Sequence, residues 1–284
     1  MRGRGGGRGP GATACHIDAC TFVDLISMNQ DQIGFPQFQQ QAARDLAPLL
    51  DRARALAAIG KEMLQQSVEE DLAAVTKQIT RTVTSSMESV LILVNNGKGT
   101  DALTIGRSMF EAAVTVSYLE SHPELVQDFV DFLWVKRKKH YDYLLKFAPA
   151  QAKLRSAVEI QQMETEYARV KSRFTNRKGV VRNSWCKLSV AAMAEEIGAA
   201  SLYGGLYPFT SSYVHVDILR LVAAKENSGE VEQAPSEINV TLALQLAVLN
   251  YAIVLTAYDQ ITHLGMAHRL DMELSSLERS QVAW

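Results

Sequence analysis

Four hydrogen-bonding side chains recur at four-residue intervals in the stretch from Ser201 to Arg220. The series is Tyr203, Tyr207, Ser211 and His215. On a helix, each step of four residues rotates the side chain by only about 40° beyond a full turn, so the series would form one slowly winding polar stripe. A histidine acts as a general acid or base near neutral pH, and a serine one turn before it is close enough to contact it. The stretch therefore locates a candidate site.

A proline interrupts this stretch at position 208. Because proline fits the first turn of a helix, we expect a helix to begin near Pro208 and to extend to about Lys225. Tyr203 would then lie on the segment that leads into the helix through Gly204 and Gly205.

Two further polar residues occur on a helix that is otherwise apolar almost all round, from Asp101 to Glu120. Arg107 and Glu111 are the only charged residues between these ends, and they are four residues apart, on one face. A lone buried charge is very costly, so we expect the two side chains to be buried as a pair. We also expect this pair to pack against the helix that starts at Pro208.

The six polar residues support two interpretations, and the sequence leaves both open. In the first, His215 and Glu111 are candidate catalytic residues, with His215 as acid or base and Glu111 orienting it or titrating itself. A small or anionic ligand of unknown identity would be bound by the remaining residues: Arg107, Tyr203, Tyr207 and Ser211. In the second, a buried ion pair is completed by tyrosine hydroxyls and capped by the histidine, with a purely structural role. A nucleophilic serine would also need an oxyanion hole, which nothing in the sequence supplies.

Several chemical signatures are missing from the sequence. There is no GxxxxGK(S/T), GxGxxG, HExxH or GxSxG motif, and there are no Glu-x-x-His pairs of the di-iron bundles. Asp259 and His263 are four residues apart, but without a third ligand we interpret them as a structural hydrogen-bonded pair. Cys15-His16 with Cys20 also lacks a second ligand pair. The sequence therefore predicts no metal site, and it identifies no cofactor.

The hydrophobic periodicity is helical from Phe35 onward, which predicts an all-α, multi-helix bundle with a central apolar helix pair. We expect a single domain over residues 35–284, preceded by a disordered Gly/Arg-rich tail over residues 1–34. The expected helices are Phe35–Ile59 with a kink at Pro48 and an end at Gly60, Lys61–Asn95, Asp101–Glu120 with Thr100 as N-cap, Pro123–Phe147, Pro149–Thr175, Leu188–Ile197 and Ile238–Leu270.

The composition is that of a soluble globular protein, with 47% apolar and 21% charged residues among 284. Three sparse cysteines form no disulfide framework, which favours a reducing, cytoplasmic location. Residues 240–258 carry no charge over the length of a membrane span. No basic cluster flanks them, and they include Gln245 and Asn250, so we expect a helix buried in the bundle rather than a span. Assembly into a homo-oligomer is compatible with this composition.

Charge is distributed unevenly along the chain. Residues 136–187 contain 14 Lys and Arg against 4 Asp and Glu, and they begin with the run Lys136, Arg137, Lys138 and Lys139. Such an excess suits an RNA partner, so RNA binding or a ribonuclease-like activity is an alternative function. The other interpretation is a solvated helix face whose charges are offset by acidic neighbours.

All-helical HEPN-type ribonucleases of bacterial conflict systems carry an Arg and a His separated by four to six residues on one helix, and this chain has no such pair. A purely structural or interaction protein is the remaining alternative.

The ordered set of polar residues also resembles a known family. Arg107 and Glu111, then Trp185, then the Tyr203/Tyr207/Ser211/His215 series are similar to a bacterial all-helical family of unknown function, domain of unknown function 5677. The resemblance covers roughly residues 85–220, and with the final helix it gives a family-like core over residues 85–265. It implies an all-helical fold, and it supplies no established activity.

Overall fold

The computed structural model describes residues 44, 46–214 and 237–281, which are helical almost throughout. All of them belong to one unit of the chain, residues 32–284. The described part contains no strand, only an isolated antiparallel bridge between Thr175 and Val181. The predicted all-α class is therefore confirmed. The predicted tail lies outside the described residues, and the expectation of a single domain stays a prediction.

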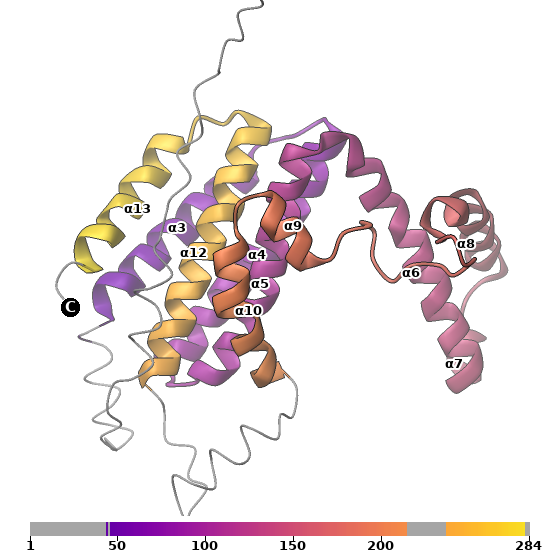
Figure 1. Cartoon of the computed structure of the whole chain (residues 1–284), viewed down its shortest axis with the longest axis horizontal. Helices are drawn as coiled ribbons and strands as arrows, with labels where there is room; N and C mark the ends of the chain where they lie inside the picture. Colours follow the sequence, from indigo (N-terminus) through magenta and orange to yellow (C-terminus); the bar gives the residue numbers. More distant parts are fainter. Residues whose placement is uncertain (1–43, 45, 215–236, 282–284) are drawn as a thin grey trace, which may run out of the picture. The chain divides into compact units, whose positions relative to one another are not determined.

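The helices are labelled as in Figure 1. In chain order they are α3 (Ala47–Gln65), α4 (Asp71–Asn95), α5 (Gly99–Ser121), η2 (Pro123–Leu125), α6 (Val126–Phe147), α7 (Pro149–Ala152), α8 (Ala157–Val170), η3 (Lys171–Phe174), α9 (Val190–Glu196), α10 (Ala200–Val214), α12 (Glu237–Thr262) and α13 (Ala267–Gln281).

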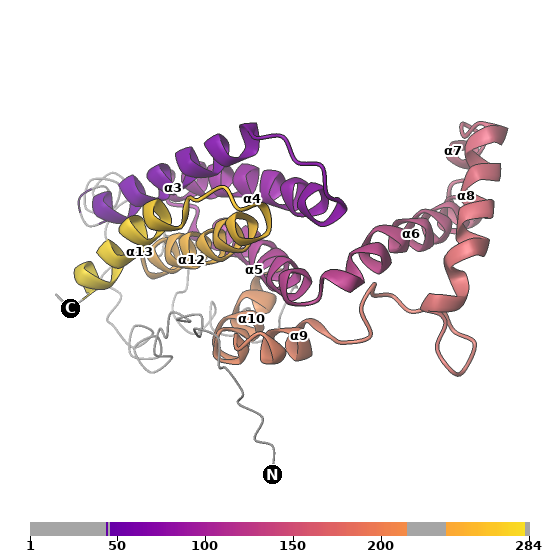
Figure 2. The ribbon, with the colours of Figure 1, turned by 90° about the horizontal axis from the view of Figure 1, so that it is seen from above.

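The bundle is built around α12, which packs most extensively against α5 and also against α4, α3 and α13 (Figures 1 and 2). α5 also packs against α9 and α10. α5 and α12 are thus the predicted central apolar helix pair. From Asn239 to Thr262, α12 is long and apolar enough to cross a membrane, with a mean hydropathy of 1.9, but 72% of its most apolar stretch is buried inside the bundle. In this structure the uncharged stretch is a core helix.

Two buried polar side chains on α12 form hydrogen bonds with the helices around it, whereas the Tyr258 hydroxyl and Asn250 Oδ1 have no partner among the described residues. The hydroxyl of the fully buried Tyr251 lies 2.9 Å from the Thr84 hydroxyl on α4. The Asn250 side chain, also fully buried, donates to the carbonyl of Gly106 on α5. Because an unpaired buried polar group is costly, these bonds fix the rotation of α12 against its neighbours.

Two predictions at the start of the bundle were wrong. Gly60 does not end a helix: it lies buried within α3, facing α12, and a Cβ there would overlap the Tyr251 hydroxyl and lie 2.9 Å from Cζ of that ring. The glycine is there so that two helices can approach closely, not to break one. Pro48 does not kink a helix either; it lies in the first turn of α3, where its missing N–H has no helical partner to lose. The chain breaks instead between Gln65 and Asp71, inside the predicted Lys61–Asn95 run.

Two further helix boundaries differ from the predictions. α5 begins at Gly99 rather than after a Thr100 N-cap, and the Thr100 hydroxyl accepts a hydrogen bond from Asn239 of α12. The last helix divides at residues 263–266, where His263 and Gly265 adopt positive φ angles of 54° and 74°. Asp259 Oδ1 accepts the Met266 N–H at this turn, so the partner of the Asp259 side chain is a backbone amide rather than the predicted histidine.

The predicted Pro149–Thr175 helix is also divided, into α7, α8 and η3. Ser156 starts α8 with a capping box, in which its hydroxyl accepts the Glu159 N–H and its own N–H donates to the Glu159 carboxylate. Two helix N–H groups that would otherwise have no partner are satisfied in this way, which makes Ser156 a strong helix start.

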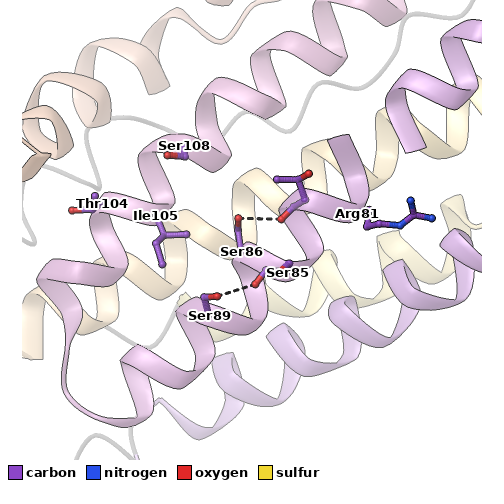
Figure 3. A pocket seen from close by; sticks show the side chains of 8 residues that line it. Arg81, Ser85, Ser86, Ser89, Thr104, Ile105 and Ser108 are labelled. Carbon is purple, nitrogen blue, oxygen red and sulfur yellow. Dashed lines mark hydrogen bonds between the residues drawn. The ribbon is translucent and has the colours of Figure 1, made fainter. Parts of the chain in front are cut away.

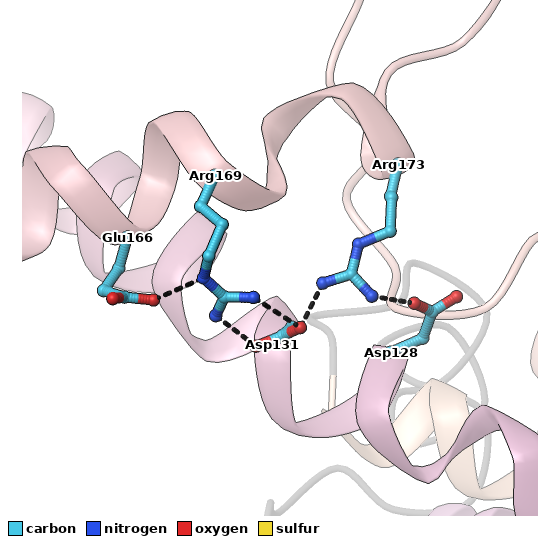
Figure 4. A network of polar contacts seen from close by, with 5 residues as sticks. All are labelled: Asp128, Asp131, Glu166, Arg169 and Arg173. Carbon is cyan, nitrogen blue, oxygen red and sulfur yellow. Dashed lines mark hydrogen bonds and ion pairs between the residues drawn. The ribbon is translucent and has the colours of Figure 1, made fainter.

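α6 and α8 pack side by side as a helical hairpin with a small apolar core of its own, consisting of Phe132, Val135, Val170 and Phe174. Beside this core, the residue Asp131 is only 1% exposed, and its carboxylate accepts hydrogen bonds from Arg169 and Arg173 (Figure 4). Arg169 also binds Glu166, and Arg173 also binds Asp128. The network therefore ties the end of α8 and η3 to α6.

We predict that Gly60→Ala destabilises the protein by about 1–3 kcal/mol, because the added methyl group overpacks the contact between α3 and Tyr251. Helix propensity alone predicts the opposite sign, a gain of about 1 kcal/mol. Chemical denaturation measures the change in unfolding free energy.

Gly205→Ala is the matched control, since Gly205 also lies inside a helix and has open space around its Cβ position. This variant should be neutral or slightly more stable. Equal stabilisation by both substitutions would contradict the close approach at Gly60.

We predict that the hairpin is weakened by acid through Asp131. Burial raises the pKa of this carboxyl, but hydrogen bonds from Arg169 and Arg173 outweigh burial and hold the pKa at about 2. A pKa below the usual value of about 4 means that the ionised carboxylate stabilises the fold above pH ~4, and that this stabilisation is lost as the pH falls toward 2. Unfolding free energies measured between these limits should show the loss, with Trp134 fluorescence reporting on α6.

Asp131→Asn should lower the stability at neutral pH and remove the acid dependence in that range. Asp128→Asn is the control, because Asp128 is a third exposed and has a single ion-pair partner, Arg173, among the described residues. An unchanged acid dependence in Asp131→Asn would exclude Asp131 as its cause.

Candidate functional site

α10 carries three of the four residues of the predicted polar stripe. The helix runs from Ala200 to Val214 with Pro208 inside it, so the prediction that it begins near Pro208 was wrong. Pro208 leaves the carbonyl of Gly204 without its helical donor, but Gly204 and Gly205 are exposed, so water can bond to this carbonyl. Tyr203 is consequently part of the helix and not of a lead-in segment. His215 and the expected extension to Lys225 lie outside the described residues.

Arg107 and Glu111 of α5 meet Tyr207 of α10 in a closed triangle of contacts. Arg107 Nη2 donates to the Tyr207 hydroxyl at 3.0 Å, and this hydroxyl donates to Glu111 Oε1 at 3.0 Å. Arg107 Nε lies 3.4 Å from the same carboxylate oxygen. The structure therefore joins the two segments through a tyrosine, with the residues at positions 107 and 111 paired along α5 as expected.

Burial of this pair is uneven. The Arg107 side chain is 17% exposed, whereas the Glu111 side chain is 43% exposed. The expected burial as a pair thus holds for the arginine only. Arg107 Nη1 is buried and has no hydrogen-bond partner in the described chain. An unsatisfied buried donor costs about 1–3 kcal/mol, so an acceptor supplied by a ligand at this atom would be stabilising.

Aromatic rings position the tyrosine. Tyr203 stacks on Tyr207 with ring centroids 4.7 Å apart, and Phe110 of α5 contacts both rings. The Arg107 guanidinium lies 4.6 Å from the Tyr207 ring centroid, within the range of a cation–π interaction. Phe110 is a site residue that the sequence analysis missed, because an apolar residue on a core helix gives no separate signal.

The Tyr207 hydroxyl is held in its protonated form. Burial raises its pKa, the hydrogen bond from Arg107 lowers it, and the bond to Glu111 raises it, with a net pKa above the usual value. At neutral pH this hydroxyl acts as a hydrogen-bond relay between a cation and a carboxylate, and not as a base. Ser211 lies half-buried one turn further along α10. Its role, like that of His215, stays a prediction.

A groove of about 540 Å³ lies between α4 and α5 (Figure 3). It is lined by six hydroxyl side chains, one arginine and one isoleucine: Arg81, Thr82, Ser85, Ser86, Ser89, Thr104, Ile105 and Ser108. Thr104, Ser108 and Glu111 fall within about 60° of one another around α5, so the groove and the Glu111 carboxylate share one face of this helix. Thr104 and Ser108, which share a helix face with Glu111, were the sequence signal for this groove, and the sequence analysis did not use them.

Most of these hydroxyl groups use their proton within their own helix. Thr82, Ser86, Ser89 and Thr104 each donate to the carbonyl four residues earlier. What remains on their oxygens is acceptor capacity, so the groove is suited to a ligand that donates hydrogen bonds.

Trp185 packs by edge contacts against Tyr118 of α5 and Phe129 of α6. It lies in the segment that leads from the hairpin to α9, and it is half-buried. These contacts give Trp185 the role of anchoring the returning chain, and Trp185 packs against the same apolar cluster as Tyr203 and Tyr207.

Two of the four residues in the basic run on α6 are engaged within the chain. Lys138 pairs with Asp142 and Glu164. Lys139 donates to the carbonyl of Arg182 and to the Asn183 side chain, which holds the basic loop against α6. Lys136 and Arg137 are exposed, beside aromatic rings. RNA binding through this run stays a prediction. At most two of its four cations, Lys136 and Arg137, are available to contact RNA.

We predict that Glu111→Gln changes the unfolding free energy by less than about 1 kcal/mol, since a half-exposed ion pair contributes little and glutamine keeps an acceptor for Tyr207. Tyr207→Phe should cost more, about 1–3 kcal/mol, because it removes the acceptor of a mostly buried arginine. Equilibrium denaturation ranks the two variants.

Glu62→Gln provides the control for charge loss, since the Arg269–Glu62 ion pair is exposed to a similar degree elsewhere on the protein. A loss in Glu111→Gln that greatly exceeds the loss in both other variants would identify Glu111 as a structural group.

Comparisons with known proteins give one match. A model described as a family of unknown function, DUF5677, matches residues 74–230, which include every residue of the predicted polar series. No curated protein and no solved structure matches the chain. The match covers more than half of the 284 residues. The chain therefore belongs to the family of unknown function DUF5677.

Proposed function

We propose that the Arg107–Glu111–Tyr207 triangle and the adjoining hydroxyl-lined groove bind a small phosphorylated sugar or nucleotide. The observation that carries the proposal is a buried, unsatisfied Arg107 Nη1 beside a half-exposed Glu111 carboxylate. A purely structural ion pair would satisfy both groups internally.

The charges define the ligand. An anionic group entering between α5 and α10 supplies the acceptor that Arg107 Nη1 lacks, and guanidinium groups favour phosphate and carboxylate oxygens. Glu111 repels an anion unless the same ligand also offers it a hydroxyl or amino donor. The hydroxyl oxygens of the groove can likewise accept hydrogen bonds from ligand hydroxyl groups, because their own protons are used within the helix. A hydroxylated phosphate ester meets all of these requirements.

His215 remains the proposed acid or base of this site, and Ser211 and Tyr203 remain proposed ligand contacts. Apart from His215, which lies outside the described residues, the groups that we propose to contact the ligand come from α4, α5 and α10. It assigns no reaction, and a bound ligand is its first consequence. The free, buried thiol of Cys186 agrees with the proposed cytoplasmic location.

The test is a thermal-shift screen with ribose 5-phosphate, adenosine monophosphate, ribose and inorganic phosphate. A phosphorylated sugar at a hundred times its Kd should stabilise the wild type by about 2.7 kcal/mol. Arg107→Lys should abolish the shift, because lysine lacks the forked donor geometry, and Glu111→Gln should reduce it, because a neutral amide accepts a hydrogen bond from a ligand hydroxyl more weakly than a carboxylate does.

Glu62→Gln is the control and should respond as the wild type does. The proposal fails if no phosphorylated compound shifts the wild type, or if Glu111→Gln responds equally. A short RNA in the same screen, compared with Lys136→Glu and Arg137→Glu, tests the alternative partner without disturbing the Lys138 and Lys139 contacts.

A further inference from the structure

Exposed apolar side chains are concentrated on the helical hairpin. Of the ten large apolar side chains that are exposed in the described part of the chain, eight lie between residues 130 and 180. Five of these fall within residues 143–158, the arm tip, which comprises the end of α6, α7 and the first turn of α8. They are Tyr143, Leu145, Phe147, Leu154 and Val158, and their exposed fractions range from 50% to 83%. A packed core would bury such side chains, so the concentration indicates a contact surface.

The arm tip is also purely basic. Its sixteen residues include Lys146, Lys153 and Arg155 and no Asp or Glu. The acids that adjoin it in sequence have partners of their own: Asp142 pairs with Lys138, and Glu159 binds Ser156 in the capping box of α8. The surface that complements the tip is therefore anionic.

The arm tip lies at the end of α6 opposite to α5 (Figure 2). With 22 residues, α6 is about 33 Å long, so the tip is well separated from the Arg107–Glu111–Tyr207 triangle along the chain path. A surface that meets the tip engages helix ends and a tight turn, not the long face of either helix.

Composition separates a bilayer from a protein partner. Lysine is depleted in the cores of protein–protein interfaces, and hot-spot residues there sit in sheltered pockets. At the arm tip, Leu154 is 83% exposed directly between Lys153 and Arg155. Leucine, phenylalanine and tyrosine interspersed with cations are typical of the bilayer interface, where the rings and alkyl groups enter the headgroup boundary and the cations stay near phosphate.

We propose that the arm tip attaches the protein to the surface of an anionic lipid bilayer. Phe147, Leu154 and Val158 insert at the headgroup level, and Lys146, Lys153 and Arg155 contact lipid phosphates. Each cation near an anionic membrane strengthens binding by about fivefold, so three cations act together with the apolar residues. The attachment is peripheral, and it leaves α12 inside the bundle.

The test is sedimentation of the full chain with vesicles of phosphatidylcholine containing about 30% phosphatidylserine, or none. The wild type should bind the anionic vesicles at least tenfold more strongly than the neutral ones, and salt should weaken binding. Phe147→Ser with Leu154→Ser, and separately Lys146→Glu with Lys153→Glu, should each reduce binding at least tenfold. Circular dichroism should find both variants folded, because the replaced side chains are exposed.

Ile92→Ser is the matched control: Ile92 is 64% exposed but lies on α4, and its replacement should leave vesicle binding unchanged. No binding by the wild type to anionic vesicles overturns the proposal. It is also overturned if Ile92→Ser and the arm-tip variants bind equally. If the wild type instead self-associates in sedimentation velocity, and Leu154→Ser abolishes this, the tip is an interface between copies and the membrane assignment is wrong.

Discussion

The structure depends on the burial of one helix, α12. α12 has no charged residue between Val240 and Tyr258, and a helix that is apolar all round cannot leave one face in water. Its neighbours α3, α4, α5 and α13 together cover it, and α5 is shared with α9 and α10. Because α5 packs against both α12 and α10, burial of α12 fixes the helix that carries Arg107 and Glu111. The candidate site is thus positioned by the core.

Close packing around α12 explains why polar residues recur on its neighbours. Threonines 76, 80 and 84 of α4 are all buried, and the last of them meets the Tyr251 hydroxyl. A threonine is nearly as small as valine, yet it offers an oxygen that can satisfy a buried tyrosine. In a similar way, the buried Asn250 side-chain amide donates a hydrogen bond to the Gly106 carbonyl of α5. These bonds give the bundle a defined register, which apolar contacts alone specify less sharply.

The fold class was predictable and several helix ends were not. Helical periodicity over most of the chain, with a single uncharged 19-residue stretch, predicted an all-α bundle with an apolar pair at its centre, and the structure confirms it. Gly60 and Pro208 were predicted to mark the end and the start of helices, because glycine and proline disfavour the interior of a helix. In the structure, Gly60 makes room for Tyr251, and Pro208 continues a helix whose preceding turn is exposed. These reasons depend on tertiary packing, which a single sequence does not reveal. For the site, spacing on α5 brought Arg107 and Glu111 together, but the choice of Tyr207 as their link depended on how α10 packs.

Linear charge is a poor guide to where an anion binds in this chain, and the hairpin shows why. The excess of cations in residues 136–187 includes Arg169 and Arg173, which neutralise the buried Asp131, and Lys139, which holds a loop through its carbonyl groups. A cation used in this way is held in place for the fold, and moving it to a ligand would leave a buried acceptor unpaired. Only cations whose neighbours make no such demand can serve a partner. In the described hairpin that condition is met best at the turn through α7, where the acids are missing from the sequence itself and the apolar side chains face outward.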